Sequence, residues 1–208
     1  MGQTKIQNSP RGEDMGDDLA QALRDRRKDG QVVYLMVDAS KSPETRATIE
    51  ALSDDALCMF DGQGFDDLAE VAPWLVPLPL DDEDDVFEWF MSAGYGKNWG
   101  LFLIAGPDAH ALKMSLKPAL WLKGENDEDL FFKFYRPSGF NNYVPGFEPE
   151  YAAHMLRDVA QVWAENGEDP TVVHRYAIRD GALGQADLRL VFDPPTPTPE
   201  MPEDIEEI

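Results

Sequence analysis

Two runs of apolar residues that no charged side chain interrupts constrain the fold more than any other feature of the sequence. They are "VVYLMV" at 32–37 and "GLFLIAG" at 100–106. Both are far shorter than a membrane-spanning helix, and such runs are typical of strands buried on both faces of a sheet. Helical patterns alternate with strand patterns through residue 123, so we expect an α/β (mixed α+β) architecture.

Periodicity and punctuation residues predict the other elements. We expect helices over 17–30, 42–52, within 81–96, where the acidic residues open the helix, and from 108 onward, and a long helix over 148–165. We expect strands over 55–62, over 68–80, where three prolines favour a sheet edge or an interruption, over 131–135, and as two final strands within 171–192. Residues 119–135 read as two strands joined by an acidic turn, and we expect Trp89 and Trp99 to be largely buried.

Composition shifts divide the chain. We expect a flexible arm over 1–14, one domain over 15–193, and a disordered Pro-rich acidic tail over 194–208. Within the domain we expect an α/β N-terminal lobe over about 15–124 and a smaller C-terminal lobe of strands plus a long helix over about 125–193.

The net charge of −22 narrows the classes of partner. Such a surface repels nucleic acid and anionic lipid and attracts a basic protein, although the same charge can serve only to keep a protein in solution. The N-terminal region has no apolar segment of the kind found in signal peptides, so we expect a cytoplasmic protein without membrane insertion. The single cysteine, Cys58, lies among apolar residues and reads as a buried structural thiol.

The sequence lacks a residue set for catalysis. Glycine-rich phosphate loops and GxSxG elbows are absent from the sequence, the three histidines stand apart from each other and from the cysteine, and the carboxylates lie mainly in runs. We therefore expect neither enzymatic activity nor a metal or other cofactor. A hydrolase is the least favoured alternative, because it needs a carboxylate cluster in a pocket.

The segment "DLFFKFYRPSGFNNYVPGF" at 129–147 carries the predicted binding site. Pro137 and Gly139 favour a sharp turn after the strand, and the loop that follows would present aromatic anchors to a partner. The candidate partner-binding residues are Tyr143, Phe140, Phe147 and Arg136, together with the acidic run Asp81, Asp82, Asp84 and Asp85. The alternatives are that the aromatic residues pack between the lobes and that the acidic run only starts a solvated helix.

The order of short motifs resembles that of the adaptor-chaperone family of the bacterial type VI secretion system, the Tap or TEC proteins. The motifs are "VYLMVDAS" at 33–40, "CMFDG" at 58–62, "LAEVAPWLVPL" at 68–78, "NWGLFLIAG" at 98–106, "LKMSLKPAL" at 112–120 and "FFKFYRPSGFNNYVP" at 131–145. The resemblance covers roughly residues 30–165. Where the family tends to have His, Arg, Asp and Arg, this chain has Ser115, Lys117, Arg136 and Ser138, so any ion-pair network made by those family residues is rewired here.

The resemblance implies a non-enzymatic function. Such an adaptor binds a toxic effector and helps load it onto the VgrG spike protein. The net charge of −22 makes an effector with a basic surface the natural complement. The alternative is an acidic immunity protein or nucleic-acid mimic that neutralises a basic toxin. An adaptor bridges effector and spike, whereas an immunity protein blocks activity and does not bind the spike.

Overall fold

The computed structural model describes residues 12–62, 68–80 and 84–190. Its helices are α1 (Gly12–Arg26), α2 (Thr45–Leu52), α4 (Asp85–Ala93), α5 (Ala109–Leu116), α6 (Pro137–Tyr143) and α7 (Pro149–Met155). Its strands are β1 (Val32–Asp38), β2 (Leu57–Cys58), β3 (Pro73–Leu78), β4 (Gly100–Ala105), β5 (Trp121–Lys123), β6 (Asp129–Phe131), β7 (Val159–Glu165), β8 (Val172–Arg179) and β9 (Ala182–Arg189). Four 3-10 turns join them: η1 (Ala39–Lys41), η2 (Ala69–Val71), η3 (Lys117–Leu120) and η4 (Val144–Gly146).

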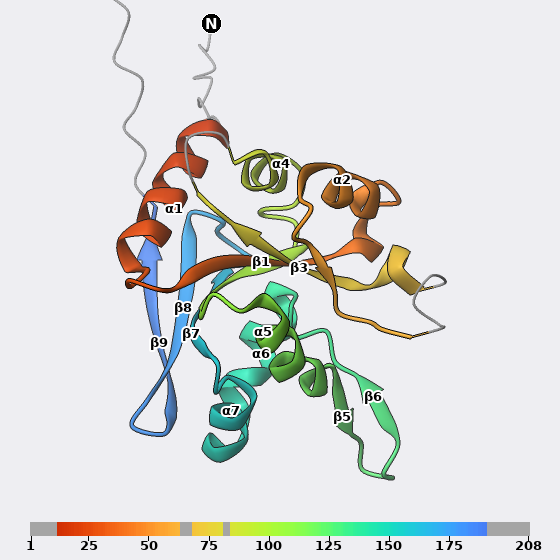
Figure 1. The fold of residues 1–208 in the computed structure, drawn as a ribbon. Coiled ribbons are helices and arrows are strands. Elements are labelled where there is room, and N and C mark those ends of the chain that lie inside the picture. Colours follow the sequence, from red (N-terminus) through yellow and green to blue (C-terminus); the bar gives the residue numbers. More distant parts are fainter. Residues whose placement is uncertain (1–11, 63–67, 81–83, 191–208) are drawn as a thin grey trace, which may run out of the picture.

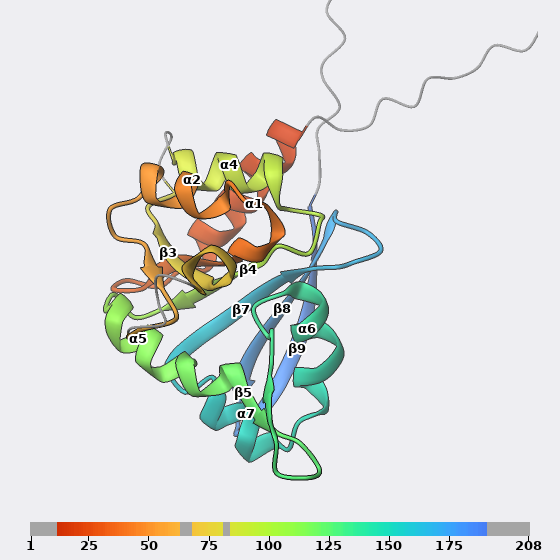
Figure 2. The ribbon, with the colours of Figure 1, turned by 90° about the vertical axis from the view of Figure 1, so that its right-hand side faces the viewer.

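A seven-stranded sheet in the order β2-β3-β1-β4-β7-β8-β9 forms the centre, and each neighbouring pair is antiparallel. Helices α1, α2 and α4 cover one face, while α5, α6, α7 and the β5–β6 hairpin cover the other (Figures 1 and 2). Every residue of β4 is buried, as is all of β1 after Val32. The prediction of a mixed α+β fold with central strands buried on both faces is therefore confirmed.

Two apolar cores lie on the two faces of this sheet. Alternate residues of β1 point into different cores, with Val33, Leu35 and Val37 in one and Tyr34 and Met36 in the other. This alternation follows from the period of two of a strand. Because both cores share the same strands, the sheet connects everything that is packed on either face.

Strand β3 is shorter than the predicted strand over 68–80, and it lies next to the sheet edge and not at the edge itself, because β2 is the outermost strand. On its outer side β3 pairs only with the two residues of β2. Met59 N–H donates to Pro73 O at 2.9 Å, so the backbone of Pro73 faces that side, and alternation places Pro77 the same way. The prolines therefore stand where a missing N–H is tolerated, close to a sheet edge.

The predicted long helix over 148–165 is wrong in its second half. Helix α7 ends at Met155 and β7 begins at Val159. The residues chosen for the helical face, Ala152, Met155, Leu156, Val159 and Trp163, are all buried. Strand β7 lies between β4 and β8, so it needs apolar side chains on both faces, and that pattern overlaps with helical spacing over so short a stretch.

The predicted strand over 131–135 is also wrong beyond its first residue. Strand β6 ends at Phe131, and Arg136 N–H donates to Lys133 O at 3.1 Å in a turn. Phe132, Phe134 and Tyr135 are nevertheless buried. A turn directs these neighbouring side chains into one core, whereas a strand would alternate them between two faces.

Trp89 and Trp99 are partly buried and pack against one of the two cores, so both are less completely buried than the residues that form that core. In α4 the buried face includes Phe87, which is 6% exposed, in addition to Val86 and Phe90. The fully packed tryptophan is Trp163, with no exposed area, and Trp74 is 3% exposed. The amphipathic face of α4 is thus rotated slightly from the predicted one.

The predicted division into lobes stays a prediction, although one sheet crosses its boundary through the pairing of β4 with β7. Helix α1 begins at Gly12, inside the predicted arm, while residues 1–11 and the tail over 194–208 lie outside the described residues. In the parts of the chain that the structure describes, no helix is long and apolar enough to cross a membrane.

Candidate interaction surface

Four aromatic side chains form a continuous row beside α6 and α7. Tyr143 packs edge-on against Phe132 with ring centroids 6.1 Å apart, and Phe132 contacts Phe147 at 5.7 Å. Phe147 packs edge-on against Tyr151 at 5.2 Å. Tyr143 is 61% exposed and Tyr151 is 40% exposed, whereas Phe132 is buried. We call these four residues the aromatic row; its ends face solvent and its middle is held in the core, as is typical of anchors at protein interfaces.

A second aromatic group lies on the β5–β6 hairpin. Trp121 is 49% exposed and packs edge-on against Phe131 at 5.1 Å, and Phe131 contacts Phe60 at 5.7 Å. Leu130 is 48% exposed. The hairpin lies on the side of the sheet that carries α5, α6 and α7 (Figure 2), and Phe132 and Phe147 of the aromatic row pack in the core of that same side.

Helix α6 packs closely against β8 and against the turn that precedes the helix. Phe140 has no exposed area and its ring lies 5.0 Å from that of Tyr176 on β8. A Cβ atom on Gly139 would lie 2.3 Å from the carbonyl oxygen of Lys133, so only glycine fits there. Pro137 occupies the first turn, where its missing N–H is not needed. Tyr143 is thus presented by a firmly seated helix.

A chain of hydrogen bonds also anchors α6 to the sheet. Ser138 N–H donates to Asn98 Oδ1 at 2.8 Å, and Asn98 N–H donates to Glu165 Oε1 at 2.7 Å. Asn141 Nδ2 donates to the Glu165 carbonyl at 3.0 Å, and the Tyr176 hydroxyl donates to Asn141 Oδ1 at 3.0 Å. Burial raises the pKa of the Glu165 carboxyl, and the N–H groups of Asn98 and Gly96 partly oppose that shift.

Arg136, a predicted partner-binding residue, is engaged within the protein. Its guanidinium pairs with the fully buried carboxylate of Asp38 and donates to Ser40 Oγ at 3.1 Å. Lys133 Nζ lies 3.6 Å from the same carboxylate. Asp38 ends β1, so this ion pair ties the entry to α6 to the central strand. A buried carboxylate requires such partners, which gives Arg136 a structural task.

The three predicted aromatic anchors occupy three different environments. Tyr143 is exposed, Phe147 is half-buried and Phe140 is completely buried. The segment expected to be a loop is α6 followed by a 3-10 turn, in which Phe140 and the buried Val144 are four residues apart. Phe140 therefore supports the surface from inside, which is the alternative of internal packing, and direct contact with a partner stays a prediction for Tyr143 and Phe147.

The acidic run contains a helix cap. Asp84 is 7% exposed and caps α4: its Oδ1 accepts from Phe87 N–H at 3.0 Å and its Oδ2 from Leu80 N–H at 2.9 Å. Asp85 is exposed. Asp81 and Asp82 lie outside the described residues. Of the two described members, only Asp85 is available to a partner.

A second ionic contact joins the segment after β2 to α5 and η3. The carboxylate of Asp61 pairs with Lys113 Nζ through one oxygen and with Lys117 Nζ at 2.6 Å through the other. These two hydrogen bonds lower the pKa of the Asp61 carboxyl. Lys117 is one of the positions where the chain departs from the family pattern, while Ser115, another one, is buried with a hydroxyl that has no hydrogen-bond partner among the described residues.

Sequence reasoning missed several exposed apolar residues on this side, among them Trp121, Leu130 and Tyr151. Trp121 and Leu130 belong to the hairpin that the sequence did predict, and alternation within it could have marked one of the two as outward-facing. Tyr151 lies four residues after Phe147 at the start of α7, a spacing that brings two aromatic rings together.

One histidine of the described residues, His174, is paired with a carboxylate. His174 Nδ1 lies 2.8 Å from Asp187 Oδ1 on the neighbouring strand β9. Across residues 12–62, 68–80 and 84–190, no group of three or more His, Cys, Asp or Glu side chains is placed to hold a metal ion. The exposed features of this side are thus aromatic and ionic surfaces.

The sequence model of a family described as a domain of unknown function, DUF4123, matches residues 33–168. The chain belongs to the DUF4123 family. The matched range runs from the first buried residue of β1 to just beyond β7, so the DUF4123 region includes the aromatic row, the hairpin and both ionic contacts. No curated protein and no solved structure matches this DUF4123 chain.

Proposed function

We propose that this DUF4123 protein is a non-enzymatic adaptor that binds a type VI secretion effector and helps load it onto the VgrG spike. The observation that carries the proposal is the aromatic row, a solvent-facing pair of tyrosines with a buried base, inside a chain of this family. Loading takes place before secretion, so the proposal assigns the protein to the bacterial cytoplasm.

The construction of the row supports a binding role. Rigidly held aromatic side chains bind at low entropic cost, because few rotamers are lost on association. Tyr143 is held by α6, which Phe140, Gly139 and the Asn98–Glu165 contacts fix in place. An aromatic side chain that only filled the core would not keep 61% of its area exposed.

The charge of the chain supports a basic effector. With a net charge of −22, long-range attraction would speed the encounter with a basic surface, while short-range contacts such as those of Tyr143 would set the lifetime of the complex. Asp85, at the start of α4, is the described member of the acidic run that is free to take part.

The test is to purify the tagged protein from its native cells and identify what is bound to it. An adaptor yields a toxic effector and a VgrG spike in the same complex, and the effector remains active when the adaptor is added to it. A single partner whose toxic activity is blocked, with no affinity for the spike, is the signature of an immunity protein and would overturn the proposal.

A further inference from the structure

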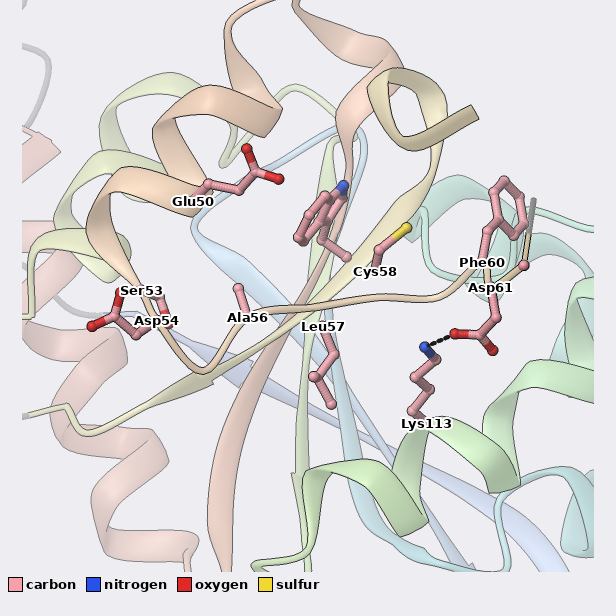
Figure 3. A pocket seen from close by; sticks show the side chains of 11 residues that line it. Glu50, Ser53, Asp54, Ala56, Leu57, Cys58, Phe60, Asp61 and Lys113 are labelled. Carbon is pink, nitrogen blue, oxygen red and sulfur yellow. Dashed lines mark hydrogen bonds and ion pairs between the residues drawn. The ribbon is translucent and has the colours of Figure 1, made fainter. Parts of the chain in front are cut away.

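A shallow groove of about 540 Å³ runs along the open edge of the seven-stranded sheet. Its floor is formed by residues between Ser53 and Gly62, the segment that contains β2, although Asp55 and Met59 do not line it; Trp74 of β3 does. Glu50 of α2 stands on one side of this segment and Lys113 of α5 on the other (Figure 3). None of the residues that line the groove belongs to the aromatic row.

The backbone along this edge has unused hydrogen-bonding capacity. Among the described strands, none pairs with the outer side of β2, which ends the sheet. Met59 N–H donates to Pro73 O, so residues 57 and 59 face β3, and alternation turns the N–H and C=O of Ala56 and Cys58 away from it, toward the groove. Unpaired N–H and C=O groups on an edge are a template for one more strand, although β2 itself is only two residues long, so an added strand would also have to pair with the chain that flanks it.

The opposite edge of the sheet differs in kind. Strand β9 carries Gln185, Asp187 and Arg189 on one face, and none of its residues lines the groove. Charged side chains on an edge strand discourage pairing with another chain. At β2 the walls supplied by α2 and α5 would instead guide an incoming segment.

The lining of the groove selects the chemistry of that segment. Leu57, Cys58 and Phe60 offer apolar contacts, whereas the charged lining residues are three carboxylates and one ammonium group. Lys113 is already paired with Asp61, and Glu50 is paired with Arg46 at 3.0 Å. Asp54 is exposed and has no ion pair within the described ranges, so a negative charge remains at the α2 end.

We infer that this groove binds an extended, basic and apolar segment of the cargo protein as an added edge strand of the sheet. The inference rests on the proposed function for the identity of the partner as cargo. Successive side chains of an added strand point alternately toward α2 and α5. Basic side chains should therefore occupy positions i and i+2 on the face directed toward α2, where Asp54 is the carboxylate without an ion pair among the described residues, with apolar residues between them.

The experiment selects random 12-residue peptides displayed on phage against the full-length protein. The peptides recovered should carry Lys or Arg at i and i+2 and apolar residues at the intervening positions. A synthetic version of the best peptide should lose binding when alternate backbone nitrogens are methylated in one parity and keep it in the other, because only one set faces β2.

Two charge reversals of neighbouring exposed residues provide the matched comparison. Asp54→Lys should weaken binding of that peptide by at least about tenfold, because an attractive contact becomes repulsive. Asp55→Lys makes the same change in net charge outside the groove lining and should weaken binding clearly less than Asp54→Lys does, because salt partly screens its charge from the peptide. Equal melting temperatures of the two variants verify that both fold.

Recovery of no peptide, of acidic peptides, or of peptides insensitive to backbone methylation would overturn the inference, as would equal effects of the two reversals. The proposed function fails separately. If Asp54→Lys still bridges effector and spike with unchanged affinity, the adaptor role stands and the groove has no part in it.

Discussion

Phe140 and Tyr143 show how one short helix divides its aromatic residues between folding and binding. Both belong to α6, but Phe140 has no exposed area and Tyr143 is 61% exposed. Both types are common in cores and at interfaces, so residue type alone does not separate the two roles. The environments of Phe140 and Tyr143 separate the two roles, so truncating Phe140 should affect stability and truncating Tyr143 should affect binding.

Phe140→Ala should lower the free energy of unfolding by about 3–5 kcal/mol, because it leaves a cavity against Tyr176. Tyr143→Ala should change it by less than about 1 kcal/mol, yet raise the dissociation rate of the effector complex with little effect on association. Urea unfolding and surface-binding kinetics measure the two effects. A Tyr143→Ala variant that unfolds as readily as Phe140→Ala would mean that the row is mainly structural.

The buried carboxyl of Glu165 predicts a pH dependence. Its folded-state pKa is raised above the ordinary 4.5 by burial, so the folded protein holds the proton more tightly than the unfolded chain. Its contribution to stability should therefore be most favourable below pH 4.5 and decline as pH rises through the folded-state pKa.

Glu165→Gln removes this titration while keeping a similar shape. Wild type should lose stability relative to Glu165→Gln as the pH is raised from about 4 to 7, measured by urea unfolding at each pH. A difference that is constant over this range, or that changes in the opposite direction, would show that the raised pKa is wrong.

At the scale of elements, the sequence predicted which helices and strands exist better than it predicted where each one ends. The buried strands β1 and β4 and the helix α5, with Leu112 and Leu116 inward, follow directly from their patterns. Residues 148–165 do not, because Val159 and Trp163 fit a helical face and a two-sided strand equally well. Only the positions of β4 and β8 decide between these, and no local pattern contains that information.

Gly139 decides whether α6 can approach the preceding turn. Gly139→Ala should destabilise the protein by about 1–3 kcal/mol, because the new Cβ would lie 2.3 Å from Lys133 O. Gly146→Ala is the matched control: nothing lies within 4 Å of its Cβ position, so it should be neutral or slightly stabilising. Equal unfolding midpoints for the two variants would count against close packing of α6.

Asp84 and Asp85 separate a cap from a solvated charge at the start of α4. Asp84→Ala removes the acceptor of two backbone N–H groups and should cost about 1–2 kcal/mol in the free energy of unfolding. Asp85→Ala should change it by at most about 0.5 kcal/mol, measured by urea unfolding. If both variants matched wild type, the cap would not contribute to stability. Because Asp84 is a cap, neutralising the whole acidic run would change folding as well as binding.

At the scale of the whole molecule, one sheet carries helices on both faces and offers two separate surfaces, the aromatic row and the groove beside β2. The sequence predicted that Tyr143 is a candidate partner-binding residue, because its neighbourhood combines aromatic residues with a turn. It could not predict that Arg136 is taken up by Asp38, since these residues are 98 positions apart. The groove was equally invisible, because an open edge is defined only once the strand order is known.

The central claim is that this protein joins an effector to a spike, and a bridging measurement on immobilised VgrG tests it most directly. The effector should be retained on the spike only when the protein is present, and Tyr143→Ala should shorten that retention while leaving the free energy of unfolding nearly unchanged. Retention that does not depend on the protein, or a protein that binds and inhibits the effector but never reaches the spike, would contradict the account.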